Sequence, residues 1–197
     1  MKRIAIIGSA LGGGAGQIIE ALQRQNAVNP VFILDRDISI IGKEVFGIKV
    51  LGPAEEITER WNRQEFDEAI IAIGGDLTER KRLYDYLIKN GIPLANIIDS
   101  SVKFGIGFTM GNGNVILNNT YFGNNTSIGN NNYILNQCSV QHDTIIEDHN
   151  YLSTNISIGA KVKMGSLNRL GIKCIVETGS NIGDNQKFKS LEVISSK

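Results

Sequence analysis

Both histidines of the chain lie in one short segment, residues 138–153, with the sequence CSVQHDTIIEDHNYLS. His142 is followed directly by Asp143, whereas His149 comes directly after Asp148. An imidazole titrates near neutrality and can take a proton from an attacking amine or hydroxyl group. It does so best when a carboxylate fixes its tautomer. The segment therefore contains a candidate general base, His142, with a candidate orienting partner.

The chain has few of the residues that bind metals, which disfavours a metal site. Zinc needs at least three good protein ligands, usually His or Cys, and the chain has two histidines and two cysteines, Cys138 and Cys174. We therefore expect no metal, unless ligands are shared across a subunit interface. Two cysteines are also too few for a disulfide framework, so we expect reduced thiols and a cytoplasmic protein.

The overall composition excludes two further classes of protein. The 197 residues carry 20 Lys plus Arg and 20 Asp plus Glu, so the formal net charge is zero. A nucleic-acid-binding protein needs a basic face, which this balance disfavours. Apolar runs are too short to span a bilayer, and we interpret the basic and apolar start, MKRIAIIGSALGGG, as a buried strand before a glycine loop.

The elements that position His142 follow a six-residue period that starts near residue 98. Every sixth residue is apolar: Ile98, Phe104, Met110, Ile116, Phe122, Ile128, Ile134, Val140, Ile146, Leu152, Ile158, Met164, Leu170, Val176 and Ile182. Such hexapeptides are typical of a parallel β-helix, in which each short strand sends one aliphatic side chain into a shared core. We predict this fold for residues 98–197.

Three hexapeptides per coil would give a period of eighteen, and two kinds of column support it. One is a column of amides: Asn114, Asn132, Asn150, Asn168 and Gln186. The other is glycine, at 111, 129, 165 and 183, which we interpret as corners that need special backbone angles. A neighbouring glycine column lies at 105, 123 and 159. The glycine columns are interrupted at Gln141 and Glu147, both in the coil of His142, and such breaks are where function is expected.

Stacking at eighteen residues places Asn124 below His142 and the small Ala160 above it, which leaves space over the imidazole. For His149, at a polar corner, we favour a structural role. Asp143 is adjacent to His142, and neighbours on an ideal strand point to opposite faces. Pairing of His142 with Asp143 therefore requires a local bend.

Residues 1–97 have a different pattern, with short buried strands at 3–8, 31–35 and 68–74 and helices at 16–26 and 77–91. Alternation of this kind predicts a small α/β domain of Rossmann-like type. The expected fold class is thus α/β plus all-β, with domains at 1–97 and 98–197.

With these features the chain resembles the bacterial left-handed β-helix sugar acyltransferases that carry an N-terminal Rossmann-like domain. Bacillosamine and perosamine N-acetyltransferases and sialic-acid O-acetyltransferases are members. The motifs IIGSALGGGAG, FILDRD, AIIAIGGD, NIIDSS and VQHDTIIED match the order of that family and cover nearly the whole chain. The resemblance implies acetyl-CoA as donor, a nucleotide-linked sugar as acceptor, a homotrimer, His142 as base and Asp143 as its partner.

The resemblance also implies where the substrates bind. Coenzyme A would lie along the later coils between subunits, near Tyr151, Gly159, Ala160, Lys161, Lys163 and Lys173, with backbone donors near Gly159 and Ala160 stabilising the oxyanion. The lysines would meet the phosphates, or else only solubilise the β-helix. The nucleotide sugar would be bound by Gly8, Gly14, Gly16, Asp35, Asp37, Gly74, Gly75 and Asp76, at the carboxyl edge of the sheet.

The chain departs from the family at several positions. Tyr151 stands where the family has a second histidine, and a tyrosine hydroxyl can also donate to a carbonyl oxygen. Leu135 stands where the family has an asparagine, and the residues after Phe188 do not contain the family's final glycine-x-proline-alanine segment, which helps to hold coenzyme A. These departures leave open a silent β-helix that binds sugar nucleotides or serves as a scaffold. A dinucleotide-dependent oxidoreductase is disfavoured by the half-size α/β unit, and an ice-binding β-helix by the lack of a threonine array. The acceptor, and N- against O-acetylation, stay open.

Overall fold

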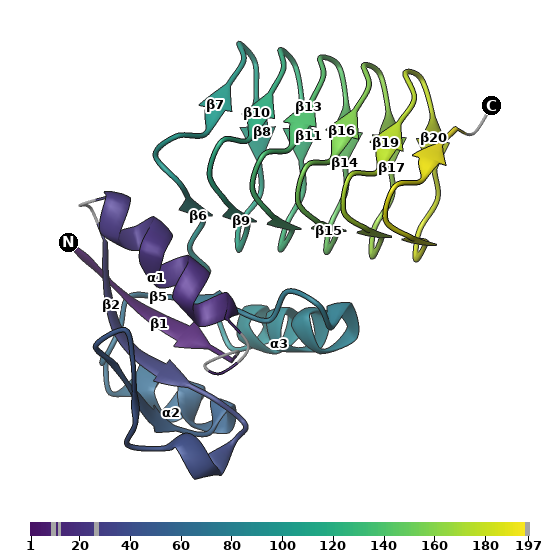
Figure 1. Ribbon diagram of the computed structural model, residues 1–197. Coiled ribbons are helices and arrows are strands. Elements are labelled where there is room, and N and C mark those ends of the chain that lie inside the picture. Colours follow the sequence, from purple (N-terminus) through teal and green to yellow (C-terminus); the bar gives the residue numbers. More distant parts are fainter. Residues whose placement is uncertain (9–10, 12, 26–27, 196–197) are drawn as a thin grey trace. The chain divides into compact units, whose positions relative to one another are not determined.

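The computed structural model describes residues 1–8, 11, 13–25 and 28–195. The chain divides into two compact units, Met1–Ile97 and Ile98–Lys197 (Figure 1). No helix among the described residues is long and apolar enough to cross a membrane. Each unit has its own buried core.

The first unit is built on a five-stranded sheet in the order β3-β4-β2-β1-β5. Strand β1 pairs in parallel with β2 and β5, β2 pairs in parallel with β4, and only β3 is antiparallel, to β4. The elements are β1 (Lys2–Ile7), α1 (Gly14–Gln25), β2 (Val28–Leu34), η1 (Ile38–Ile40), β3 (Glu44–Val45), β4 (Ile48–Gly52), η2 (Ala54–Glu56), α2 (Ile57–Asn62), β5 (Glu68–Ile71) and α3 (Leu77–Lys89).

The sequence pattern accounts for the longer of these elements. The apolar residues of strands β1 and β5, at 4–7 and 69–71, are all buried, as expected of strands in a parallel sheet. Helix α3 begins where the Asp76 carboxylate accepts a hydrogen bond from the Glu79 amide, and Gly91 adopts a φ of 68° just after the helix. The short elements β3, β4, η1, η2 and α2 have no clear periodicity and were not predicted.

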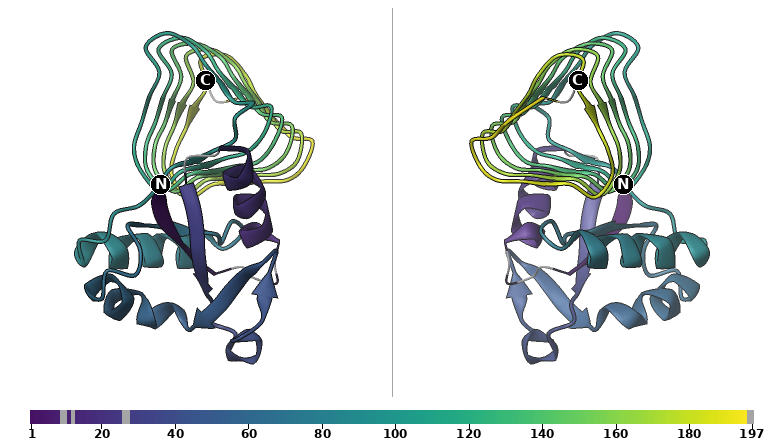
Figure 2. Two further views of the ribbon diagram at one scale, coloured as in Figure 1. Left: turned by 90° about the vertical axis from the view of Figure 1, so that its left-hand side faces the viewer. Right: turned by 90° about the vertical axis from the view of Figure 1, so that its right-hand side faces the viewer.

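The second unit is a parallel β-helix, as predicted. Strands of two residues recur every six residues: β6 (Ile97–Ile98), β7 (Lys103–Phe104), β8 (Thr109–Met110), β9 (Val115–Ile116), β10 (Tyr121–Phe122), β11 (Ser127–Ile128), β12 (Tyr133–Ile134), β13 (Ser139–Val140), β14 (Ile145–Ile146), β15 (Tyr151–Leu152), β16 (Ser157–Ile158), β17 (Lys163–Met164), β18 (Arg169–Leu170), β19 (Ile175–Val176), β20 (Asn181–Ile182), β21 (Lys187–Phe188) and β22 (Val193–Ile194). They form three parallel sheets, which enclose a triangular prism when viewed along its axis (Figure 2).

The pairing register confirms the period of eighteen. Tyr121 pairs with Ser139 and Ser139 with Ser157, each one coil further on. The predicted aliphatic column fills the prism, and nearly all its side chains are buried. Phe104, in the first coil, is 40% exposed and stacks on Phe122 at 5.7 Å between ring centroids.

The amide column is confirmed as a hydrogen-bonded ladder. The backbone N–H of Asn132 donates to the side-chain oxygen of Asn114, and the N–H of Asn150 to that of Asn132, at 2.9 and 2.8 Å. The same step is repeated at Asn168 and Gln186. These asparagines are fully buried, so the ladder satisfies backbone groups that water cannot reach.

Our interpretation of the glycine columns was wrong. Left-handed backbone angles do recur every six residues, but mostly at other residue types: Gly107, Gly113, Asn119, Asn125, Asn131, Gln137, Asp143, His149, Asn155, Lys161, Leu167, Lys173, Gly179, Asn185 and Leu191. Except for Gly183, the predicted corner glycines instead stand where a Cβ would meet the next coil. A Cβ on Gly129 would lie 2.1 Å from the Asp148 carboxylate, and one on Gly123 would lie 2.6 Å from the backbone nitrogen of His142.

Candidate functional site

His142 and Asp143 occupy the corner between β13 and β14. Asp143 has a φ of 58°, and this left-handed residue supplies the bend that the pairing requires. His142 Nδ1 lies 2.9 Å from Asp143 Oδ2, and the two side chains are 53% and 42% exposed. The corner thus presents a paired imidazole to solvent.

The charge state of Asp143 decides the tautomer of His142. The hydrogen bond with His142 is the largest cause of a lowered pKa of the Asp143 carboxyl, followed by a hydrogen bond from Asn125 and by the charges of His142 and Lys161. At neutral pH the carboxylate can only accept. The neutral imidazole therefore carries its proton on Nδ1 and keeps the Nε2 lone pair for a substrate proton.

One coil further on, the backbone offers a hydrogen-bond donor near this corner. Lys161 donates its N–H to the His142 carbonyl at 3.0 Å, which stacks the two coils as predicted. The Gly159 N–H is used by the Val176 carbonyl at 2.8 Å and is not available for an oxyanion. Within the described part of the chain, the Ala160 N–H has no acceptor. Of the two predicted oxyanion donors, only Ala160 is therefore open.

The same stacking accounts for the glycines of this column but not for its interruption at Gln141. Gly123 and Gly159 each precede a corner. A Cβ on Gly123 would approach the backbone of His142 in the next coil, and a Cβ on Gly159 would approach the backbone of Thr178. Beside Gln141, one coil on, stands Ala160. Ala160 has these backbone atoms too, so the size of its side chain does not account for the exception.

His149 has the structural role that its corner position suggested. It is 7% exposed, and its Nδ1 lies 2.9 Å from the side-chain nitrogen of Asn131, one coil earlier. An amide nitrogen donates, so this contact makes Nδ1 the acceptor.

The residues assigned to coenzyme A are spread over the prism. Lys161 lies at the corner of Asp143, Lys163 follows on β17, and Lys173 lies at a different corner, between β18 and β19. Tyr151 is on β15, in a sheet that contains neither β13 nor β14. Burial raises the pKa of its phenol, and the guanidinium carbon of Arg169 lies 5.3 Å from the ring centroid.

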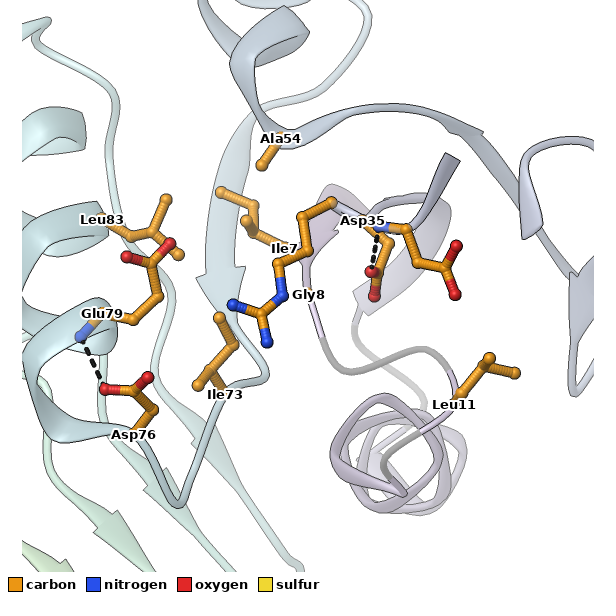
Figure 3. Close-up of a pocket in the computed structure, with 11 residues that line it drawn as sticks. Ile7, Gly8, Leu11, Asp35, Ala54, Ile73, Asp76, Glu79 and Leu83 are labelled. Carbon is orange, nitrogen blue, oxygen red and sulfur yellow. Dashed lines mark hydrogen bonds between the residues drawn. The ribbon is translucent and has the colours of Figure 1, made fainter. Parts of the chain in front are cut away.

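A second candidate site is a cavity of about 250 Å³ in the first unit (Figure 3). It is lined by Ile7, Gly8, Leu11, Asp35, Arg36, Asp37, Ala54, Ile73, Asp76, Glu79 and Leu83. Four of the predicted substrate residues, Gly8, Asp35, Asp37 and Asp76, are among them. Figure 3 shows Asp35 on one side and Asp76 with Glu79 on the other.

The cavity lies where β1, β2 and β5 end, and short contacts shape it. Gly8 has a φ of 81°, and a Cβ there would lie 2.7 Å from Ile73. Asp35 is buried and accepts the Asp37 N–H at 3.0 Å. Arg36, between these two, brings a guanidinium to the lining and was missed, since an arginine between two aspartates carries no periodic signal.

Four predicted glycines do not line this cavity: Gly14, Gly16, Gly74 and Gly75. Gly16 lies under the Phe46 ring, where a Cβ would be 2.7 Å from the ring, so its smallness serves packing of the β3–β4 hairpin. Residues 9, 10 and 12 of the glycine loop lie outside the described residues. Among the residues that are described, no three His, Cys, Asp or Glu side chains are grouped to hold a metal.

Comparison with known proteins relates this fold to solved structures. No protein-family profile and no curated sequence matches the chain. A histidine-to-alanine variant of GDP-perosamine N-acetyltransferase from Caulobacter crescentus, bound to CoA and GDP-perosamine, has a TM-score of 0.88 at 22% identity. The match covers 98% of this chain and 89% of that one.

Two further structures resemble the chain over similar lengths. The acetyltransferase domain of PglB from Neisseria gonorrhoeae, in complex with acetyl coenzyme A, has a TM-score of 0.85 at 18% identity, covering 98% of this chain and 90% of that one. WeeI from Acinetobacter baumannii has a TM-score of 0.62 at 18% identity, covering 96% and 94%. At these identities the likeness is one of fold: the chain shares the fold of left-handed β-helix sugar N-acetyltransferases.

Proposed function

We propose that this protein transfers the acetyl group of acetyl-CoA to an amine or hydroxyl of a nucleotide-linked sugar, with His142 as general base. The observation that carries the proposal is the His142–Asp143 pair, 2.9 Å apart and exposed to solvent, on a fold shared with sugar acetyltransferases. A buried or unpaired imidazole would not support this chemistry.

In the proposed reaction, Nε2 of His142 removes a proton from the attacking group as its nitrogen or oxygen bonds to the thioester carbonyl carbon. The Asp143 carboxylate stabilises the imidazolium that forms. The open Ala160 amide is suited to hold the carbonyl oxygen as it becomes negative. The carbon–sulfur bond then breaks, and the departing thiolate takes up the proton from His142.

We further propose that the first unit is a Rossmann-like domain that binds the nucleotide of the sugar in the cavity beside Asp35. The carboxylates of Asp35, Asp37 and Asp76 can accept hydrogen bonds from the hydroxyl and amino groups of a nucleoside. Arg36 is the cation in the lining that could meet a phosphate. Replacement of Asp35 by Asn should weaken binding of the nucleotide sugar, measured by calorimetry, without changing the KM for acetyl-CoA.

The remaining parts of the proposal concern assembly and location. We propose a homotrimer in which coenzyme A lies between neighbouring β-helices and meets Tyr151, Lys161, Lys163 or Lys173 of one subunit or another. Light scattering tests the trimer directly. The two cysteines are free and buried, which suits the reducing cytoplasm, where we expect the reaction to occur.

The test of the proposed function is release of free thiol from acetyl-CoA in the presence of a panel of acceptors. GDP-linked and UDP-linked amino sugars, their hydroxyl counterparts and sialic acid form the panel, and His142→Ala is the control. Thiol release that depends on one class of acceptor and on His142 would support the proposal. Tight binding of a nucleotide sugar without any thiol release would favour the alternative, a silent β-helix that binds sugar nucleotides.

A further inference from the structure

Asn125 contacts the candidate dyad from the coil below. Its side-chain nitrogen lies 3.2 Å from Asp143 Oδ1, while Asp143 Oδ2 faces His142 Nδ1 at 2.9 Å. A carboxylate only accepts hydrogen bonds, so the Asn125 amide donates through its nitrogen. Each oxygen of the carboxylate thus has its own donor, one in its own coil and one in the coil below.

The backbone explains why an asparagine can serve here. Asn125 stands at the left-handed corner position, with a φ of 55°, one coil before Asp143 with a φ of 58°. Asparagine is among the few residues with a side chain that adopt this conformation readily. Because both residues occupy the same position in successive coils, their side chains are stacked along the prism.

Other asparagines at the same corner position provide a contrast. Asn119 and Asn155 also have left-handed angles, at φ 58° and 61°, and are exposed. No side-chain hydrogen bond joins either to a charged group among the described residues. The contact of Asn125 is therefore a property of its neighbour Asp143 and not of the corner itself.

We propose that Asn125 is a positioning residue for the catalytic pair. It holds the Asp143 carboxylate so that the second oxygen faces His142, and in this way it keeps the imidazole in the tautomer that can accept a proton. The expected effect on acetyl transfer rests on the proposed function, whereas the expected effect on the His142 tautomer does not. The charged groups that face Asp143 are His142 in its own coil and Lys161 in the coil above.

Two variants test the proposal, and each keeps the backbone conformation. Asn125→Gly removes the donor at a φ that glycine adopts freely. Asn125→Asp is of the same size but places a second carboxylate beside the first. Asn155→Gly is the matched control, since it makes the same change at a corner without an acidic neighbour.

The first measurement is the pKa of His142 by NMR, for which the chain is well suited because it has only two histidines and one of them is buried. Asn125→Asp should move the His142 titration to higher pH, because a nearby negative charge favours the imidazolium. The spectrum of His142 should also lose its preference for the Nδ1–H tautomer in Asn125→Gly. Asn155→Gly should leave both properties unchanged.

The second measurement is the pH profile of acetyl transfer. Asn125→Gly should lower kcat/KM about 3- to 10-fold, the usual effect of one lost hydrogen bond, with an unchanged KM for acetyl-CoA. Asn125→Asp should move the acid limb of the profile to higher pH, in parallel with the NMR value. A loss of activity from misfolding would not shift the limb.

The proposal is overturned if the tautomer of His142 in Asn125→Gly matches that in Asn155→Gly, because Asn125→Gly removes the hydrogen bond without adding a charge. This NMR result does not depend on an acceptor, so failure of the proposed function and failure of this inference are distinguishable. No thiol release with any acceptor would refute the first, while a changed tautomer of His142 in Asn125→Gly would still support the second.

Discussion

Two successive corners of the β-helix carry the same two residue types in opposite order. At the first, His142 precedes Asp143, and the two side chains bond to each other at the surface. At the second, six residues later, Asp148 precedes His149, and each bonds to the coil before it. His142 is 53% exposed, whereas His149 is 7% exposed.

The two corners differ in which residue type takes which of the two positions. At the first position of the second corner, Asp148 accepts the Asn130 N–H at 2.6 Å and the Asn130 side chain at 3.1 Å. The second position is left-handed, with φ of 58° at Asp143 and 61° at His149. Which residue occupies which position, and not composition, separates a candidate catalytic corner from a structural one.

Among substitutions at the two corners, we expect the largest effect from one at the first corner, where it should reduce the activity. His142→Ala should lower acetyl transfer by about 10²–10⁴-fold, the usual contribution of a general base. Because the ring is exposed, the thermal midpoint of unfolding should stay near that of the wild type. Turnover like that of the wild type in this variant would remove the mechanism.

A second substitution at the same corner should act through the backbone. Gly123→Ala places a Cβ 2.6 Å from the nitrogen of His142, so the coil must shift and carry the imidazole with it. A displacement of about 1 Å can cost roughly 10²-fold in rate. Gly183→Ala is the matched control, because nothing lies within 4 Å of its added Cβ. Equal activity of the two variants would contradict the explanation of the glycine column.

At the second corner we expect a loss of stability. Asp148→Ala leaves two donors of Asn130 without this acceptor and should lower the free energy of unfolding by about 1–3 kcal/mol, as measured by urea denaturation. Acetyl transfer by the folded fraction should be unchanged. If Asp148→Ala were as stable as His142→Ala, the assignment of a structural corner would be wrong.

The smallest expected effect is a dependence of stability on pH. The Asp143 pKa is lowered from its ordinary value of 3.8 in the folded protein, mainly by the hydrogen bond with His142. Its contribution to stability is therefore complete above about pH 4 and is lost as the pH falls through the lowered value. Between pH 4 and pH 2, wild type should lose slightly more stability than Asp143→Asn. Parallel unfolding curves of the two proteins across that range would argue against an ionised pair.

Much of the β-helix could be predicted because its physics is local and repeated. The apolar side chains from Ile116 to Ile182 recur every six residues, and each strand needs one such side chain in the core. The core residues can therefore be identified from the sequence alone. The amide ladder was predictable for the same reason. The corner glycines were misinterpreted because glycine has two uses, freedom of angle and absence of a Cβ, and a sequence does not distinguish them.

The candidate site was predicted less completely, because it depends on residues from different coils and strands. His142 and Asp143 are neighbours in sequence, but their contact required the left-handed angle of Asp143. The period of eighteen places Asn125 below Asp143, but it does not show that the Asn125 amide bonds to the carboxylate. Arg36 sits among aspartates and carries no pattern. Likewise, only the structure shows that the Gly159 N–H donates to the Val176 carbonyl and is therefore not available to a substrate.

By itself, the sequence determined that the second half winds into stacked coils, because coils of this kind bury the apolar side chain that recurs every six residues. It also determined where an imidazole and a carboxylate stand side by side. Only the tertiary structure decided which histidine is exposed, which amide stays open and which asparagine holds the carboxylate. These properties arise from contacts across coils, where exposure and hydrogen bonding depend on what the neighbouring turn of the chain presents.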